Sequence, residues 1–132
     1  ERAEQYNVKI NYSGLIPTMG ITDVDICTLM SNAIDNAIEA CAKDRSDNMK
    51  EVTVTADFKR GCFFFTVKNP IFETVRIQKD NKIRTTKEDK AIHGYGLSNI
   101  IKVSKRYNGD TKVRVYNKEF ILESYLFIKE DV

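Results

Sequence analysis

The sequence holds little of what defines several large classes of protein. Among 132 residues it has two prolines, no tryptophan, a single histidine, His93, and three cysteines, Cys27, Cys41 and Cys62. The cysteines form no Cys-x-x-Cys pair and have one histidine to join them, so we expect no structural zinc site. An odd number of scattered thiols is typical of a reducing compartment, and we expect all three to behave as small core hydrophobes.

The sequence also has no large excess of positive or negative charge and no long apolar run. The net charge of +2 is too small to indicate a surface that binds nucleic acid or an anionic membrane. The longest apolar run centres on residues 63–65, whereas a membrane helix needs about 18 apolar residues. We also expect no signal peptide within this sequence. We therefore expect this chain to contact neither nucleic acid nor a membrane.

What remains is the composition of one folded domain. Hydrophobic residues make up 42% and charged residues 30% of the chain, which is typical of a globular protein rather than a disordered one. The length fits a single domain, 1–132, with a core of its own. The chain opens on Glu1 without a methionine, and we expect it to be a fragment of a longer protein.

The apolar pattern predicts five strands and two helices. A helix begins at Thr22 or Asp23, and its apolar side chains follow at spacings of three and four as far as Cys41. A second helix covers 94–107 and ends at Asn108–Gly109. Alternation of apolar and polar residues predicts strands at 7–12, 51–58, 62–67, 111–116 and 120–128.

Residues 72–92 are charged and lack clear periodicity. A structureless connection of about 20 residues is longer than usual, and such segments tend to be lids or binding loops. The resulting order is strand, helix, hairpin, lid, helix and hairpin. Helices on one face of a mixed, mostly antiparallel sheet make an α+β fold, a two-layer sandwich.

The first helix carries a polar stripe that suits a metal site. Asn32, Asn36 and Glu39 share the helical spacing of three and four, on the face opposite the apolar one. A neutral carboxamide oxygen suits Mg²⁺ when phosphates of a substrate supply the negative charge. The alternative, a solvated helix face without a function, is the commoner explanation of such a stripe taken alone. Asparagine is a mediocre helix former, so two of them in mid-helix are a small signal of function.

The second helix opens on a glycine turn, His93-Gly94-Tyr95-Gly96-Leu97. Glycines let backbone N–H groups approach a ligand closely, and the N-terminus of a helix attracts phosphate. The run Gly-x-x-x-x-Gly-Lys is absent, which excludes a Walker-type loop. A third glycine and a preceding apolar strand are also absent, which excludes a Rossmann fingerprint. A nucleotide whose phosphates lie between residues 32–39 and 94–96 is the prediction.

The order of these features resembles a known family. LMSNAIDNAIEAC (29–41), a hairpin, a charged lid and HGYGLSNI (93–100) resemble the ATP-binding domain of sensor histidine kinases. That domain has the Bergerat fold of the GHKL superfamily, which includes type II topoisomerases and mismatch-repair ATPases. The resemblance covers essentially the whole chain. The phrase Asp-Asn-Ala-Ile-Glu-Ala (35–40) is most similar to the peptide-pheromone-sensing kinases of Gram-positive bacteria.

The resemblance implies roles for the helix and for the cations. Asn36 would be the Mg²⁺ ligand, and Asn32 would assist as a second-shell ligand or general base. Many of these kinases have a lysine that reaches a phosphate where this chain has Glu39. A carboxylate cannot replace that cation, so we expect Lys43 or Lys87 to supply it. Most other charged residues of the lid are expected to be a solvated loop.

The glycine turn would bind ATP through His93, Gly94, Tyr95, Gly96 and Leu97. We do not expect His93 to be the phosphorylated histidine, because the acceptor of this family lies on a helix of a separate dimerisation domain.

The adenine end departs from the common pattern. Most members carry Asp-x-Gly-x-Gly after the second hairpin strand, and the aspartate accepts a hydrogen bond from the adenine amino group. Here Asn69 and Pro70 stand at that place. Asn69 can accept through its side-chain oxygen, but it is neutral and can flip to present a donor, while Pro70 stiffens the turn. We expect ATP binding that is weaker or less selective for adenine.

The implied function is that of a sensor-kinase catalytic domain with ATP and Mg²⁺ as cofactors. It would transfer the γ-phosphoryl group to a histidine on the dimerisation domain of the same kinase, for relay to a response regulator. The parent would be a homodimeric membrane protein with this domain in the cytoplasm. Without its acceptor domain the fragment would not autophosphorylate. Two alternatives stay open: an anti-sigma-type serine kinase, and a non-catalytic nucleotide-binding or scaffold module.

Overall fold

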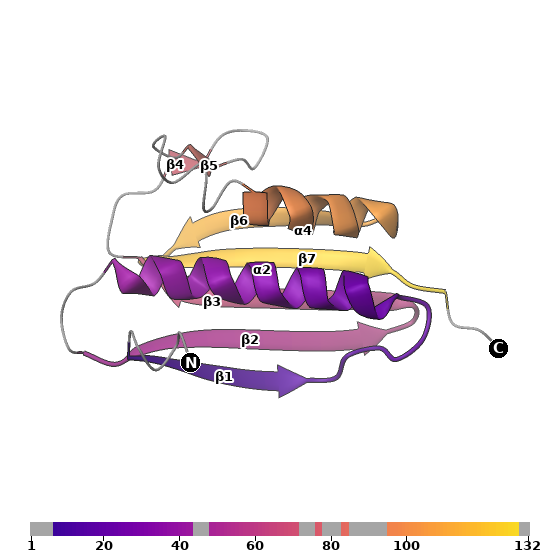
Figure 1. Ribbon diagram of the computed structural model, residues 1–132, viewed down its shortest axis with the longest axis horizontal. Helices are drawn as coiled ribbons and strands as arrows, with labels where there is room; N and C mark the ends of the chain where they lie inside the picture. Colours follow the sequence, from indigo (N-terminus) through magenta and orange to yellow (C-terminus); the bar gives the residue numbers. More distant parts are fainter. Residues whose placement is uncertain (1–6, 44–47, 72–75, 78–82, 85–94, 130–132) are drawn as a thin grey trace.

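The computed structural model describes residues 7–43, 48–71, 76–77, 83–84 and 95–129. Two long helices and a five-stranded sheet form most of this part (Figure 1). The elements are β1 (Val8–Gly14), α2 (Asp23–Ala42), β2 (Lys50–Lys59), β3 (Cys62–Pro70), β4 (Arg76–Ile77), β5 (Ile83–Arg84), α4 (Tyr95–Arg106), β6 (Asp110–Tyr116) and β7 (Glu119–Phe127).

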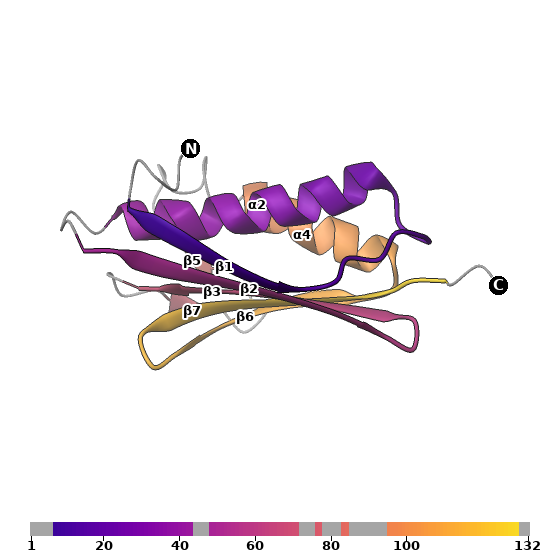
Figure 2. The same ribbon diagram turned by 90° about the horizontal axis from the view of Figure 1, so that it is seen from below.

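The large sheet has the order β1-β2-β3-β7-β6. β1 and β2 run parallel, and α2 is the crossover between them; every other neighbouring pair in this sheet is antiparallel. Both helices cover the same face of the sheet (Figure 2). The predicted α+β sandwich with a mixed, mostly antiparallel sheet is therefore confirmed.

α2 begins as its sequence predicts. Thr22 is the N-cap, with extended backbone (φ −74°, ψ 153°), and its Oγ1 accepts a hydrogen bond from the Asp25 N–H at 3.1 Å. Thr22 rather than Asp23 therefore caps the helix, and it satisfies one of the N–H groups that a helix start leaves open. The apolar stripe of α2 packs on the sheet, with Leu29 and Cys41 fully buried.

The two hairpins of the large sheet turn through residues with positive φ. Arg60 (φ 52°) and Gly61 (φ 77°) join β2 to β3, and Asn117 (φ 54°) and Lys118 (φ 61°) join β6 to β7. Two such residues in a row make the turn whose twist matches that of the flanking strands. Alternation along β3 buries its core-facing side chains between these turns and the helices.

α4 ends in a left-handed residue, and that residue is Asn108 (φ 61°). The Gly109 N–H donates to the Ser104 carbonyl at 2.9 Å and the Asn108 N–H to the Lys105 carbonyl at 3.0 Å. This pair of bonds closes the last turn of the helix. Gly109 is needed for space instead, since a Cβ there would lie 1.7 Å from the Tyr125 carbonyl oxygen.

Residues 72–92 are not wholly without secondary structure, which corrects the sequence-based expectation. β4 and β5 form a small antiparallel pair in which Arg76 pairs with Arg84 and Ile77 with Ile83. The period-2 signal was missed because each strand is only two residues long. The other residues of this segment lie outside the described part of the chain.

The cysteines occupy three different environments. Cys41 is in the core, Cys27 is exposed on α2, and Cys62 is half-buried in β3, where burial raises the pKa of its thiol. All three are free thiols. The expectation that each would be a core hydrophobe is therefore wrong for Cys27, whose position falls on the solvent-facing stripe of its helix.

Neither α2 nor α4, the helices in the described part of the chain, is both long and apolar enough to span a membrane.

Candidate functional site

The polar stripe of α2 meets the start of α4. A Cβ added to Gly96 would lie 2.8 Å from Asn36 Oδ1 and 3.3 Å from Asn36 Nδ2. Real Cβ atoms essentially never come within 3.0 Å of another heavy atom, so the Asn36 carboxamide can occupy this place only because residue 96 is glycine. The structure thus brings together the two motifs that the sequence places 60 residues apart (96 minus 36).

This contact points the Asn36 carboxamide at a helix start. α4 begins at Tyr95, and the residues that open it carry no charge. The first N–H groups of a helix have no partners within it and attract anions. Asn36 is half-buried, which contradicts the expectation that this stripe lies on the face opposite the packed one. An amide oxygen and the N–H groups of a helix start therefore lie side by side.

Leu97 supports this helix start from the core. Its side chain is 8% exposed and belongs to the core, so it anchors the glycine turn to the fold. A core anchor of this kind is often a requirement for a well-placed loop backbone. Because the Leu97 side chain packs in the core, a contact of this residue with ATP would be made by its backbone.

Asn32 lies one turn before Asn36 and is also half-buried. Its Nδ2 donates to the Thr28 carbonyl at 2.7 Å. A carboxamide has two N–H donors and one acceptor oxygen. One N–H is therefore occupied within the helix, and Oδ1 is the acceptor that Asn32 offers to a ligand.

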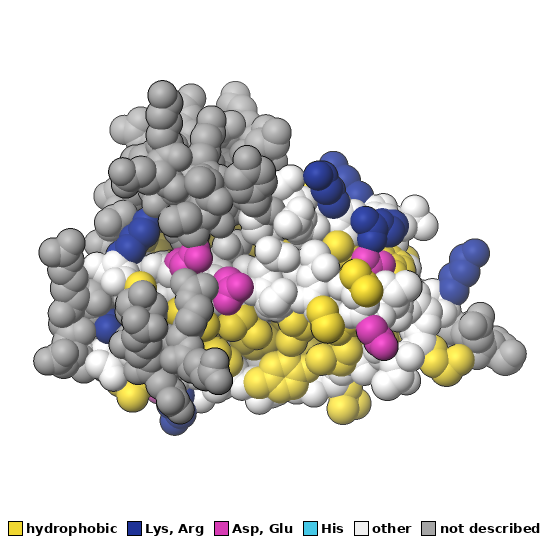
Figure 3. All heavy atoms as spheres, viewed as in Figure 1, with side chains coloured by type: hydrophobic (Ala, Val, Ile, Leu, Met, Phe, Trp, Pro, Cys, Tyr) yellow, Lys and Arg dark blue, Asp and Glu magenta, His cyan; other side chains and the backbone are white. Residues whose placement is uncertain are grey.

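Neither α2 nor the first half of α4 contains a lysine or an arginine. Lys43 is the C-cap of α2 and is exposed, while Glu39 is half-buried one turn before it. The basic residues of α4 lie in its second half (Lys102, Lys105 and Arg106). Figure 3 shows Lys and Arg side chains over that part of the helix. A phosphate at the opposite end of α4 would depend on a cation from elsewhere, as the sequence indicates.

Asn69 lies within β3, paired with Phe120 of β7, and not in a turn after the strand. Pro70 also belongs to β3, paired with Glu119, so the expectation that these two residues form the turn is wrong. Asn69 is 2% exposed. Its Nδ2 donates to the Pro70 carbonyl at 3.1 Å, which fixes the amide orientation and leaves Oδ1 as an acceptor.

Figure 1 shows where these elements meet. The end of β3, the C-terminal part of α2 and the start of α4 all lie toward the same end of the molecule. Asn69 shares the helix-covered face of the sheet with its core neighbours Phe65 and Val67, because side chains alternate along a strand. The described residues that are predicted to bind adenine and phosphate therefore lie on the helix-covered side of the sheet, toward one end of the fold.

Three predicted ATP-binding residues lie outside the described residues: Lys87, His93 and Gly94. For Tyr95 the structure describes the backbone, as the first residue of α4, and not the side chain. Their predicted roles stay predictions.

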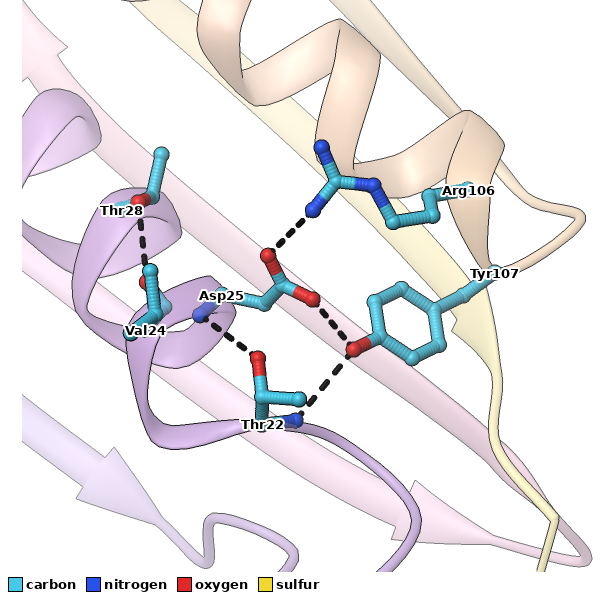
Figure 4. A network of polar contacts seen from close by, with 6 residues as sticks. All are labelled: Thr22, Val24, Asp25, Thr28, Arg106 and Tyr107. Carbon is cyan, nitrogen blue, oxygen red and sulfur yellow. Dashed lines mark hydrogen bonds and ion pairs between the residues drawn. The ribbon is translucent and has the colours of Figure 1, made fainter.

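Sequence reasoning missed a network at the other end of the two helices (Figure 4). The Asp25 carboxylate accepts from Arg106 Nη1 at 2.5 Å through Oδ1 and from the Tyr107 hydroxyl through Oδ2. The Tyr107 oxygen also accepts from the Thr22 N–H at 3.3 Å. The sequence offers one signal, an aspartate in the first turn of a helix, but the positive end of the helix dipole is sufficient to explain such a residue.

The environment of Asp25 holds it charged. Asp25 is buried, with 5% of its surface exposed. Burial alone would raise the pKa of this carboxyl, but hydrogen bonds from Tyr107 and the Thr22 side chain, together with the charge of Arg106, outweigh burial and lower the pKa.

Comparisons with known proteins agree with this geometry. Residues 21–126 match a protein-family model described as the GHKL domain. The catalytic domain of histidine kinase ThkA is similar in structure, with a TM-score of 0.72 at 15% identity, over 98% of this chain and 86% of that one. Histidine kinase AdeS of Acinetobacter baumannii is similar with a TM-score of 0.66 at 11% identity, over 98% of this chain and 58% of that one.

A third similar structure is ThkA in complex with the response regulator TrrA. Its TM-score is 0.66 at 13% identity, over 97% of this chain and 36% of that one. The chain thus spans about three fifths of AdeS and about a third of the ThkA chain in that complex. A comparison with curated protein sequences finds no match. The similar structures agree on the fold, and because the family model matches residues 21–126 of 132, the chain belongs to the GHKL domain family.

Proposed function

We propose that this chain is the ATP-binding catalytic domain of a two-component sensor histidine kinase. One observation carries the proposal: the Asn36 carboxamide lies against Gly96 in the first turn of α4. An amide oxygen beside the first N–H groups of a helix suits a ligand that combines a cation with phosphates. Mg·ATP is such a ligand. The GHKL family match and the similarity to histidine kinase catalytic domains support this choice.

The donor set fits Mg²⁺ shared with a triphosphate. Asn36 supplies a neutral oxygen, and Mg²⁺ commonly takes one or two protein ligands and completes its octahedron with water and substrate phosphates. Asn32 would hold a water beside it through Oδ1, since the hydrogen bond from Nδ2 to the Thr28 carbonyl fixes the amide group on the helix. Bound magnesium would neutralise negative charge on the phosphates. Asn69 Oδ1 would accept from the adenine amino group.

The reaction is phosphoryl transfer between domains. A histidine nitrogen of the dimerisation domain attacks the γ-phosphorus, the bond to the β-phosphate oxygen breaks, and ADP leaves. This chain would contribute the position of the triphosphate rather than a nucleophile. We propose that a response regulator then receives the phosphoryl group. The proposed parent is a homodimeric membrane kinase of the peptide-pheromone-sensing type, with this domain in the cytoplasm.

Replacement of Asn36 by alanine tests the proposal. Titration calorimetry of the 132-residue chain with Mg·ATP should give binding for the wild type and a loss of at least about 100-fold for Asn36→Ala. Asn11→Ala is the matched control, because Asn11 lies on β1 beside Thr53 and alternates with the core-packed Ile10. We expect Asn11→Ala to bind as the wild type does. Undiminished binding by Asn36→Ala would disprove the assignment.

Two alternatives give different results in the same experiments. A scaffold module produces no heat with Mg·ATP. A serine kinase binds Mg·ATP but labels a hydroxyl, and its phosphoprotein survives acid, whereas phosphohistidine does not. Radiolabelled ATP with the domain in its full-length parent therefore separates the two kinases.

A further inference from the structure

Two close contacts join the helices of the site, one toward each end of α4. At one place Asn36 of α2 meets Gly96 of α4. At the other, Asp25 of α2 meets Arg106 at the end of α4 and Tyr107 just after it. Because the order of the contacts is reversed between the helices, α2 and α4 run antiparallel, as Figure 1 shows.

The distances between the two contacts match. Along α2, 11 residues separate Asp25 from Asn36, a rise of about 16 Å at 1.5 Å per residue. Along α4, 10 residues separate Gly96 from Arg106, a rise of about 15 Å. Two contacts with similar spacing on both helices, together with the apolar packing between them, fix the position of one helix along the other. A contact at one end alone would leave a shear motion open.

The Asp25 contact is built to be rigid. Both carboxylate oxygens are used, the aspartate is buried, and Tyr107 bridges the carboxylate to the Thr22 N–H at the helix start (Figure 4). The Phe127 N–H donates to the Tyr107 carbonyl at 2.9 Å, so this end of α4 is also joined to the sheet. We name the set Thr22, Asp25, Arg106 and Tyr107 the helix clamp.

The contact at the other end is close. Gly96 lies so close to Asn36 that even one added carbon would collide with the carboxamide. A shift of α4 along α2 by a fraction of a residue would therefore change the place of the helix N–H groups relative to Asn36 Oδ1. Misplacement of about 1 Å by a distant mutation is enough to impair a site of this kind.

We propose that the helix clamp positions the phosphate-binding start of α4 on Asn36, and that Asp25 is a positioning residue for nucleotide binding. The inference rests on the proposed function. Asp25 acts through α4 and touches no reacting atom. Loss of the clamp should therefore weaken Mg·ATP binding more than loss of stability alone explains.

The test compares Asp25→Ala with a core variant of similar thermal stability. Val52→Ala on β2 serves as that control, because Val52 is fully buried and lies outside both helices. At a temperature where every variant is folded, we expect Asp25→Ala to bind Mg·ATP about tenfold more weakly, in the range that distant coupled residues produce, and Val52→Ala to bind as the wild type does. Asp25→Asn, which keeps the shape and one acceptor, should fall between them and replaces Asp25→Ala if that variant fails to fold.

A second measurement needs no nucleotide. The amide resonances of Gly96 and of the Asn36 side chain in the nucleotide-free chain report the contact itself. We expect Asp25→Ala to move both and Val52→Ala to leave both in place. Unmoved resonances in Asp25→Ala, or moved resonances with unchanged affinity, would overturn the inference. If the wild type binds no Mg·ATP, the proposed function fails, and the resonances still decide whether the clamp sets the contact.

Discussion

Replacement of Gly96 by alanine should separate the stability of this fold from its nucleotide binding. The new Cβ would lie 2.8 Å from Asn36 Oδ1, 3.3 Å from Nδ2 and 3.4 Å from Cγ. The collision is with a short side chain and not with backbone, so the Asn36 side chain can rotate away. The helix start would remain, and the carboxamide would lose its place beside it.

The stability terms nearly cancel. Alanine in place of glycine in a helix gains up to about 1 kcal/mol, while an off-rotamer side chain costs about 0.5–1.5 kcal/mol. The free energy of unfolding should therefore change by less than about 1 kcal/mol, which corresponds to roughly 4 °C or less in the melting temperature. The protein should remain folded with both helices in place.

The binding term does not cancel. Displacement of a ligand oxygen and an added carbon on the phosphate-facing turn should weaken Mg·ATP binding by about 100-fold, or ~2.8 kcal/mol. Thermal unfolding and titration calorimetry on one sample measure both terms. Lys102→Ala is the control, because Lys102 is exposed on the same helix and this change also favours helix. Wild-type affinity in Gly96→Ala would refute the reasoning that this close contact forms the phosphate site.

Two further predictions concern the ends of the site. Asn69→Leu should abolish a preference for ATP over GTP in competition binding, because Oδ1 is the acceptor that the Pro70 hydrogen bond leaves for adenine. Asn69→Asp, which keeps an acceptor oxygen, should keep that preference. An unchanged preference in Asn69→Leu would exclude the residue from base recognition. The pKa of Asp25 is lowered, so its contribution to stability is complete above the usual pKa and is lost as pH falls through the lowered one. Thermal melts from pH 7 to pH 2 should therefore show a smaller acid loss in Asp25→Asn than in the wild type, and equal losses would contradict a charged clamp.

The order of elements followed from local chemistry. Alternation on β2 and β3, the apolar stripe of α2 and its Thr22 cap depend on neighbours within a few residues, so the sequence predicted them. The predicted strand at 7–12 is β1, which continues to Gly14. The predicted element boundaries are wrong where pairing with another strand extends an element. An example is β3, which pairing with β7 extends to include Asn69 and Pro70.

The motifs of the site were also local, and the family resemblance gave them roles. Asn32 and Asn36 share one helix stripe, and the glycine turn opens the next helix. Exposure of that stripe was not predictable, because the solvation of a helix face depends on what packs against it. Glu39 and the asparagines are half-buried where the pattern indicated a solvated face.

The sequence by itself determined that an asparagine-bearing helix, a glycine turn and a two-layer α+β fold occur together in this chain. Spacing along the chain encodes those features, since each depends on residues a few positions apart. Only the tertiary structure decided that Gly96 lies on Asn36 and that Asp25 holds Arg106 and Tyr107 from 81 and 82 residues away. Contacts over such separations arise from the packing of α2 against α4 on the sheet, and no local pattern records them.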